Sequence, residues 1–196
     1  GRVDKLEKIC SKKTFAGIVG IGHVRWATHG VPNEINAHPH SNESVSVVHN
    51  GIIENSTILK KLLEKKGYKF KSQTDTEVIT ALLSENLKKS TPLVAIQKTL
   101  EKLHGSYALG ILFKDNPDLI VGARRGSPLA VGYGHNENYL GSDSYALKSM
   151  TNKISYLEDG EICLLTKDNA EFYNSKGKKI NKKILTLSED SESYEK

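Results

Sequence analysis

Ser-Val-Ser-Val-Val-His-Asn-Gly, residues 44–51, is the stretch that decides the fold. Its β-branched valines predict a strand over Ser44–His49. The pair Asn50-Gly51 follows, and on its own that pair is typical of a type I′ hairpin turn. The same pair places a side-chain amide next to a backbone N–H that a ligand can approach closely, which is what an oxyanion hole requires. The sequence leaves both interpretations open.

Three helices are predicted downstream of this strand. Residues 55–66 carry apolar side chains at helical spacing. Thr74 and Glu77, three residues apart, have the spacing of a capping box and open a second helix. The Thr-Pro pair at 91–92 opens a third, with proline at the first helical position. The apolar face predicted for the first of these helices consists of Ile58, Leu59, Leu62 and Leu63.

The pattern changes after residue 105. Short β-prone runs follow one another, separated by turn residues, with one short helix predicted at Ser142–Met150. Runs of strands beside grouped helices favour an α+β fold with mostly antiparallel sheets over alternating βαβ units. The predicted strands are Tyr107–Phe113, Leu119–Ala123, Leu129–Gly132, Tyr139–Gly141, Ile154–Leu157, Ile162–Thr166 and Glu171–Tyr173.

Upstream of the opening stretch, the sequence predicts a helix over residues 3–10 and a β-prone run at Phe15–Ile21. The chain has 196 residues, which suits one domain. We expect that domain to occupy residues 1–185. The polar, acidic residues 186–196 are expected to form a linker.

The formal net charge of +5 comes almost entirely from lysine, since only four of the 28 basic residues are arginine. Nucleic-acid readers favour arginine for bidentate contacts, so we expect a solvated lysine-rich surface and no nucleic-acid partner. No apolar run approaches the ~18 residues of a membrane span, and no signal segment is recognisable. Two cysteines, Cys10 and Cys163, are too few for a disulfide scaffold. We therefore expect a cytoplasmic protein without a membrane partner.

Five of the seven histidines lie in one stretch of 27 residues: His23, His29, His38, His40 and His49. Histidines at this density could supply the ligands of a zinc hydrolase. No HExxH pattern or cysteine partner supports that interpretation, and Pro39 disfavours a regular strand through His38 and His40. Hydrogen-bonding histidines are the alternative.

A second interpretation is a site for an amino acid. Arg25 could hold a carboxylate through two parallel hydrogen bonds, and Asp75 could hold an ammonium group. A ligand that carries both charges on one carbon needs such a pair. Taken alone, Asp75 is equally well explained as a helix cap.

Four motifs occur in a fixed order: Arg25-Trp26-Ala27-Thr28-His29-Gly30, Asn36-Ala37-His38-Pro39-His40, His49-Asn50-Gly51-Ile52-Ile53-Glu54-Asn55 and Thr74-Asp75-Thr76-Glu77. Together they resemble the class II, N-terminal-nucleophile glutamine amidotransferase domain, in the form found in glucosamine-6-phosphate synthases. The resemblance runs from about residue 20 to residue 160. It implies a four-layer αββα sandwich with two mostly antiparallel sheets.

The resemblance also implies roles for individual residues. Arg25, helped by Thr28 and His29, would bind the α-carboxylate of L-glutamine, and Asp75 would bind its α-ammonium group. The side-chain amide of Asn50 and the backbone N–H of Gly51 would form the oxyanion hole. Trp26 would lie where family members gate the passage of ammonia. Neither a cofactor nor a metal is implied.

In this family the nucleophile is an N-terminal cysteine whose own α-amino group acts as the general base. The chain begins at Gly1. Cys10 follows other residues and lacks a free α-amine, and Cys163 lies in an apolar run. We therefore expect an N-terminally truncated domain that binds glutamine without hydrolysing it. Sugar-isomerase domains would be its partners in the full-length enzyme, with self-association of that enzyme left open.

The leading hypothesis is thus the glutamine-hydrolysing, ammonia-donating part of an enzyme that converts fructose 6-phosphate and glutamine to glucosamine 6-phosphate and glutamate. Two alternatives remain. One is a non-catalytic product of a split or decaying amidotransferase gene that acts as a binding module. The other is a metal-dependent hydrolase that uses the cluster His23–His49.

Overall fold

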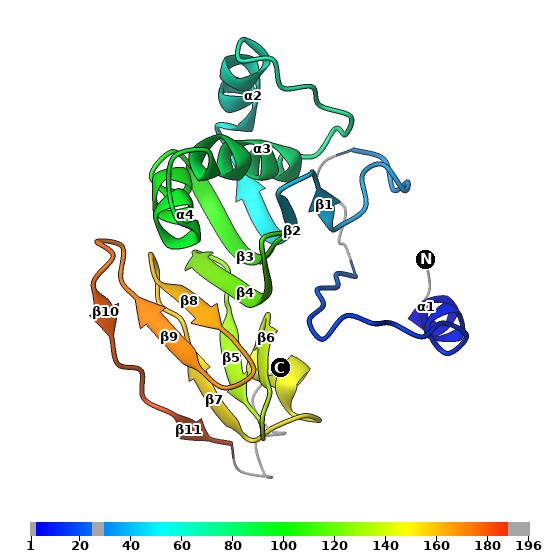
Figure 1. The fold of residues 1–196 in the computed structure, drawn as a ribbon, viewed down its shortest axis with the longest axis vertical. Helices are drawn as coiled ribbons and strands as arrows, with labels where there is room; N and C mark the ends of the chain where they lie inside the picture. The colour runs from blue at the N-terminus through cyan, green and yellow to red at the C-terminus, as the bar shows by residue number, and fades with distance from the viewer. Residues whose placement is uncertain (1–2, 25–29, 188–196) are drawn as a thin grey trace, which may run out of the picture.

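The fold is known from a computed structural model, which describes residues 3–24 and 30–187. It contains helices and strands in the grouped order predicted from the sequence (Figure 1). The helices are α1 (Val3–Cys10), α2 (Ser56–Glu64), α3 (Thr76–Leu87), α4 (Pro92–Leu100) and α5 (Ser144–Leu147). The strands are β1 (His40–Ser41), β2 (Val45–Ile53), β3 (Gly105–Phe113), β4 (Asn116–Arg125), β5 (Ala130–Tyr133), β6 (Asn138–Gly141), β7 (Lys153–Tyr156), β8 (Ile162–Leu165), β9 (Ala170–Tyr173), β10 (Lys179–Ile180) and β11 (Leu185–Thr186).

The strands form two sheets in which every described pairing is antiparallel. One sheet has seven strands in the order β1-β2-β3-β4-β8-β9-β10, and the other has four in the order β11-β7-β5-β6. All nine residues of β2 pair with β3, from Val45 opposite Phe113 to Ile53 opposite Gly105. This long ladder makes β2 and β3 the centre of the scaffold.

Three apolar clusters show how the layers stack. The largest lies between the seven-stranded sheet and α2, α3 and α4, and includes Val47, Ile79 and Leu109. A second, with Val131 and Leu157, lies between the two sheets. A third joins the outer face of the smaller sheet to α5 through Ala130, Leu147 and Ile154. The molecule is therefore an α+β sandwich with the layer order α, β, β, α, as the resemblance implied.

The helix predicted over residues 55–66 is present as α2, but its predicted apolar face is only half correct. Leu59 and Leu63 are buried, whereas Ile58 and Leu62 are exposed. The reason is that α2 packs through Leu59 and Leu63 into the main apolar cluster beside α3, which leaves the neighbouring side of the helix uncovered. The two-residue strands β1, β10 and β11 were not predicted, because so short a run carries no recognisable period.

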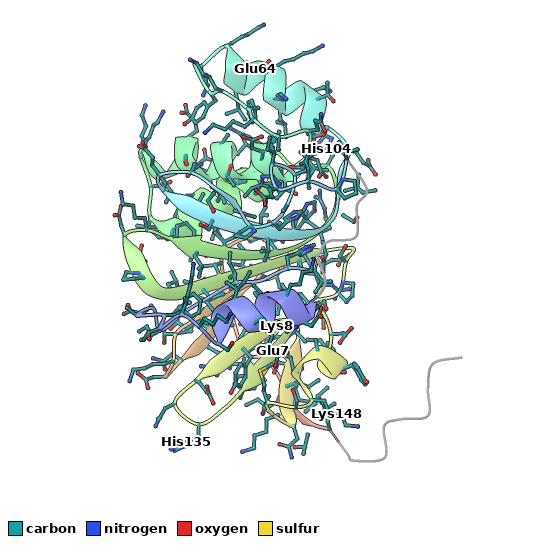
Figure 2. The ribbon with its side chains drawn as sticks, turned by 90° about the vertical axis from the view of Figure 1, so that its right-hand side faces the viewer. Glu7, Lys8, Glu64, His104, His135 and Lys148 are labelled. Carbon is teal, nitrogen blue, oxygen red and sulfur yellow. The ribbon has the colours of Figure 1, made fainter. Side chains whose placement is uncertain are left out.

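The N-terminal segment, residues 3–24, differs from the rest of the fold. Helix α1 forms where it was predicted, but none of its residues is buried. Phe15–Ile21 does not form the expected strand. Its apolar residues Phe15 and Ile18 are strongly exposed. Figure 1 shows α1 standing apart from the sheets, and Figure 2 places Glu7 and Lys8 in the foreground of the view from that side.

Within residues 3–24 and 30–187, no helix is both long enough and apolar enough to cross a membrane.

Candidate functional site

The pair Asn50-Gly51 lies inside strand β2, opposite Ala108 and Tyr107 of β3. The hairpin-turn interpretation of this pair is therefore wrong. The nine-residue ladder with β3 continues through the pair and overrides its local turn preference. Gly51 has a φ of 130°, and a Cβ added there would lie 2.2 Å from the carbonyl oxygen of Ser106. Only glycine fits that backbone, because any side chain at this position would run into the main chain of β3.

The side chain of Asn50 is exposed and borders a cleft of about 470 Å³ between the two sheets. The floor of the cleft comes from β2 and β3, and the opposite wall comes from the end of β6 and the turn that follows it. Its lining residues are Gly22, His23, Val24, Val48, His49, Asn50, Ala108, Leu109, Gly110, Leu129, Leu140, Gly141, Ser142 and Ala146. An amide that projects from a strand into a cleft is well placed to donate hydrogen bonds to a bound oxygen.

Asp75 lies at the N-terminus of α3 and is 6% exposed. Its side chain makes no capping hydrogen bond to the helix. Instead, Oδ2 accepts a 2.7 Å hydrogen bond from the backbone N–H of Ile53. Among residues 3–24 and 30–187, β1 pairs with β2 only at Ser46 and Val47, so no described strand covers the outer edge of the later part of β2. Asp75 lies against that edge. Asp75 thus occupies the N-cap position, as the helix-cap interpretation predicted, but its carboxylate bonds to β2 and not to the helix.

The capping box predicted from Thr74 and Glu77 does not form either. The Glu77 carboxylate accepts hydrogen bonds from the backbone N–H groups of Lys71 and Ser72, at 2.6 to 3.1 Å. Burial would raise the pKa of Glu77, but these hydrogen bonds outweigh it and lower the pKa. Glu77 therefore fixes the loop that leads into Asp75.

Asn36 and Gln73 were not recognised from the sequence as part of the site. Asn36 Oδ1 accepts from the backbone N–H of Gln73, and Asn36 Nδ2 donates to Gln73 Oε1, each at 2.9 Å. Asn36 Nδ2 also donates to the carbonyl of Val31 at 3.0 Å. Gly30 has a φ of 73°, and a Cβ there would lie 2.6 Å from Asn36 Nδ2. Asn36 thus ties together the two loops that carry candidate residues. The one sequence feature that could have indicated this role is that Asn36 opens the second of the four ordered motifs.

The histidine cluster is bonded to threonines of α3 and of the loop before it. Thr76 Oγ1 lies 3.0 Å from both His38 Nε2 and His49 Nδ1. Thr74 Oγ1 lies 2.9 Å from His40 Nε2. Among the residues that the structure describes, no group of three His, Cys, Asp or Glu side chains is arranged to hold a metal ion. His38, His40 and His49 thus connect α3 and the loop before it to β1 and β2.

The two cysteines are unlike each other. Cys163 is completely buried in β8, and burial raises the pKa of its thiol to about 12. It is therefore protonated, and unreactive, at neutral pH. Cys10 is exposed at the end of α1, the helix that stands apart from the sheets (Figure 1). The structure brings neither thiol to Asn50.

Arg25, Trp26, Thr28 and His29 lie outside the described residues, so their predicted roles remain predictions. The described part thus brings together the Asn50-Gly51 pair, the buried Asp75 and the loops that hold them. This combination of fold and site defines a class II glutamine amidotransferase domain.

Comparison with known proteins confirms that class. A family described as a glutamine amidotransferase domain matches residues 23–149, so the chain belongs to this family. Among curated proteins, a glutamine–fructose-6-phosphate aminotransferase (isomerizing) from Mesorhizobium japonicum is 50% identical over 184 residues, covering 93% of this chain and 30% of the relative. The protein of the same name from Caldanaerobacter subterraneus is 46% identical over 198 residues, covering 100% of this chain and 32% of the relative. The chain thus spans about a third of the length of these relatives.

Solved structures agree on the fold. A glutamine phosphoribosylpyrophosphate amidotransferase from B. subtilis superposes with a TM-score of 0.64 at 26% identity, covering 78% of this chain and 34% of that one. A structure described as the allosteric regulatory enzyme of purine biosynthesis gives 0.63 at 28% identity, with the same coverage of each chain. These proteins share the sandwich, whereas the curated relatives share the sequence more closely.

Proposed function

We propose that the site binds L-glutamine, with Asp75 receiving the α-ammonium group. The observation that carries the proposal is a buried carboxylate without a cationic partner in the described part of the chain. Burial of an uncompensated charge costs several kcal/mol, so such a carboxylate is normally paired. One oxygen of Asp75 is engaged by Ile53, two residues along β2 from Gly51, a separation of about 7 Å. A single small amino acid can therefore contact both Asp75 and Gly51.

The other end of the ligand would meet Asn50 and Gly51. Donors at these two positions would stabilise the negative charge that develops on the side-chain carbonyl oxygen of glutamine when a nucleophile attacks it. Arg25, supported by Thr28 and His29, would hold the α-carboxylate, and Trp26 would gate the departing ammonia. These four roles rest on the sequence resemblance.

The whole reaction is proposed from the relatives. Their name supports a role for the chain as the glutamine-hydrolysing part of an enzyme that makes glucosamine 6-phosphate and glutamate from fructose 6-phosphate and glutamine. Sugar-isomerase domains would receive the ammonia. The two unpaired cysteines support a cytoplasmic setting.

These 196 residues are proposed to bind glutamine without hydrolysing it. Cys163 is buried and protonated, and Cys10 lies on the exposed helix α1, which stands apart from the sheets (Figure 1). Release of glutamate by the purified chain, abolished by changing Asn50, would contradict this part of the proposal.

Calorimetric titration of the purified chain with L-glutamine and D-glutamine tests the binding. Wild-type protein should bind the L isomer. Asp75→Asn should weaken binding by about 100-fold, because it removes one partner of a charge-assisted pair. Asparagine keeps an oxygen for the Ile53 N–H, so circular dichroism should show a folded variant. The control is Asp115→Asn, which alters an exposed aspartate in the β3–β4 turn. Equal affinity of Asp75→Asn and wild type would refute the proposed site.

A further inference from the structure

The amide oxygen of Asn50 contacts a histidine from the N-terminal segment. His23 Nε2 lies 2.7 Å from Asn50 Oδ1. An amide oxygen only accepts hydrogen bonds, so His23 must carry the proton on Nε2 and donate it. With Oδ1 engaged in this way, Asn50 Nδ2 is directed away from His23.

Orientation matters for the chemistry that Asn50 is proposed to perform. The terminal torsion of an asparagine is soft and roughly two-fold, so rotation exchanges the oxygen and nitrogen positions at little cost. An oxyanion needs the N–H donors of Nδ2, whereas Oδ1 in the same place would repel it. Asn50 is exposed at the cleft, so burial does not select one of the two orientations.

His23 is itself positioned by residues of the site. Its ring lies against the ring of His38, with centroids 4.4 Å apart. His38 Nε2 in turn lies 3.0 Å from Thr76 Oγ1, and Thr76 follows Asp75 directly. The contact series from Thr76 through His38 to His23 therefore ends on Asn50. It links the carboxylate end of the site to the amide end.

We propose that His23 is a positioning residue for the oxyanion hole, whose Nε2–H fixes Asn50 so that Nδ2 faces the bound ligand. The inference rests on the proposed glutamine site, since it assigns the donor that faces the ligand's side-chain oxygen. It predicts that loss of His23 harms recognition of negative charge at that position and spares recognition of the rest of the ligand.

Three amino acids separate these effects in binding titrations with the purified chain. L-norvaline has the α-amino and α-carboxylate groups and an apolar side chain. L-glutamine adds the amide. L-homocysteate carries a tetrahedral, negatively charged sulfonate where glutamine has its amide carbon, and so imitates the oxyanion.

His23→Ala should weaken binding of homocysteate about 10-fold, equivalent to about 1.4 kcal/mol, and change the affinity for norvaline less than two-fold. His23→Gln should restore most of the homocysteate affinity, because its Nε2 can donate from nearly the same position. The matched control is His135→Ala, which changes an exposed histidine in the β5–β6 turn, far from β2 (Figure 2). Equal weakening of all three ligands, or unchanged homocysteate affinity, would overturn the proposal.

A ligand-free measurement separates this inference from the proposed function. Nuclear magnetic resonance relaxation of the Asn50 side-chain amide should show a rigid group in wild type and in His23→Gln, and a mobile one in His23→Ala. If the wild-type chain bound none of the three amino acids, the proposed function would be refuted. The relaxation measurement needs no ligand, so it would still test the role of His23. An equally rigid Asn50 amide in His23→Ala would overturn that role.

Discussion

Strand β2 and the N-terminal segment are both rich in apolar, β-prone residues, yet only β2 belongs to a sheet. β2 pairs with β3 along all nine of its residues, and its inward side chains, such as Val47, are completely buried. In the N-terminal segment, Ile18 is 78% exposed and Val24 is 85% exposed. The difference teaches that β propensity describes a fit to a half-buried surface, so a run becomes a strand only where a partner covers it.

The largest difference in stability between β2 and the N-terminal segment should come from glycine-to-alanine substitutions. Gly51→Ala should destabilise the fold by about 4 kcal/mol, because the new Cβ would clash with the Ser106 carbonyl in a backbone conformation that other residues rarely adopt. Gly20→Ala, in the N-terminal segment, meets no atom within 4 Å and should change stability by less than about 0.5 kcal/mol. Urea unfolding followed by circular dichroism measures both. Similar losses in the two variants would erase the contrast.

Removal of aliphatic side chains gives the next largest difference. Val47→Ala should cost about 2 kcal/mol, since it leaves a cavity between the seven-stranded sheet and α3. Ile18→Ala removes more atoms but from an exposed position, and should cost less than about 0.5 kcal/mol. The same unfolding titration applies. A cost for Ile18→Ala equal to that for Val47→Ala would show that the N-terminal segment is packed in solution.

A threonine pair tests the hydrogen bonds between the histidines and α3. Thr76→Val keeps the shape of the side chain but removes the hydroxyl that contacts His38 and His49, which should cost about 1.5 kcal/mol. Thr14→Val changes an exposed threonine of the N-terminal segment and should have little effect. If the two variants melted at the same temperature, the histidine cluster would contribute nothing to the joint between α3 and β2.

The smallest effect concerns pH. Because the pKa of Glu77 is lowered in the folded protein, its contribution is fully present above the unfolded pKa of about 4.3 and is lost as the pH falls through the lower folded value. Glu77→Gln should therefore cost about 1 kcal/mol near pH 6 and progressively less towards pH 3. Glu7→Gln on α1 controls for the loss of one negative charge. Unfolding titrations across this range measure it, and a pH-independent difference for Glu77→Gln would contradict the assignment.

Much of the fold could be predicted from local patterns. The helices α1 to α4 and the strands β3 to β9 appear within a few residues of the predicted ranges. They could be predicted because the apolar spacing and the flanking turn residues that indicate them lie within each segment itself. The predicted strand at Phe15–Ile21 failed for the opposite reason, since a strand needs a neighbour that no local pattern reveals.

The candidate site could be named from the sequence only as a set of residues, whose roles stay predictions. The structure adds their placement: Asn50 and Gly51 lie in β2, and Asp75 lies against the same strand. Its hydrogen bond to Ile53 joins residues 22 positions apart, and the Asn36 bonds to Gln73 join residues 37 apart. Sequence spacing carries no information about such pairs.

By itself, the sequence determined the grouped order of helices and strands, the glycine at position 51 and the four ordered motifs that mark the family. The tertiary structure alone decided how the polar groups are used. It placed Asn50-Gly51 inside a strand and the Asp75 carboxylate against β2. It bonded Glu77 to the preceding loop, three histidines of the cluster to threonines and His23 to Asn50. The physical reason is that a buried polar group must form a hydrogen bond, and tertiary contacts can supply partners from distant parts of the sequence. A local capping or turn interaction forms only where no such partner competes with it.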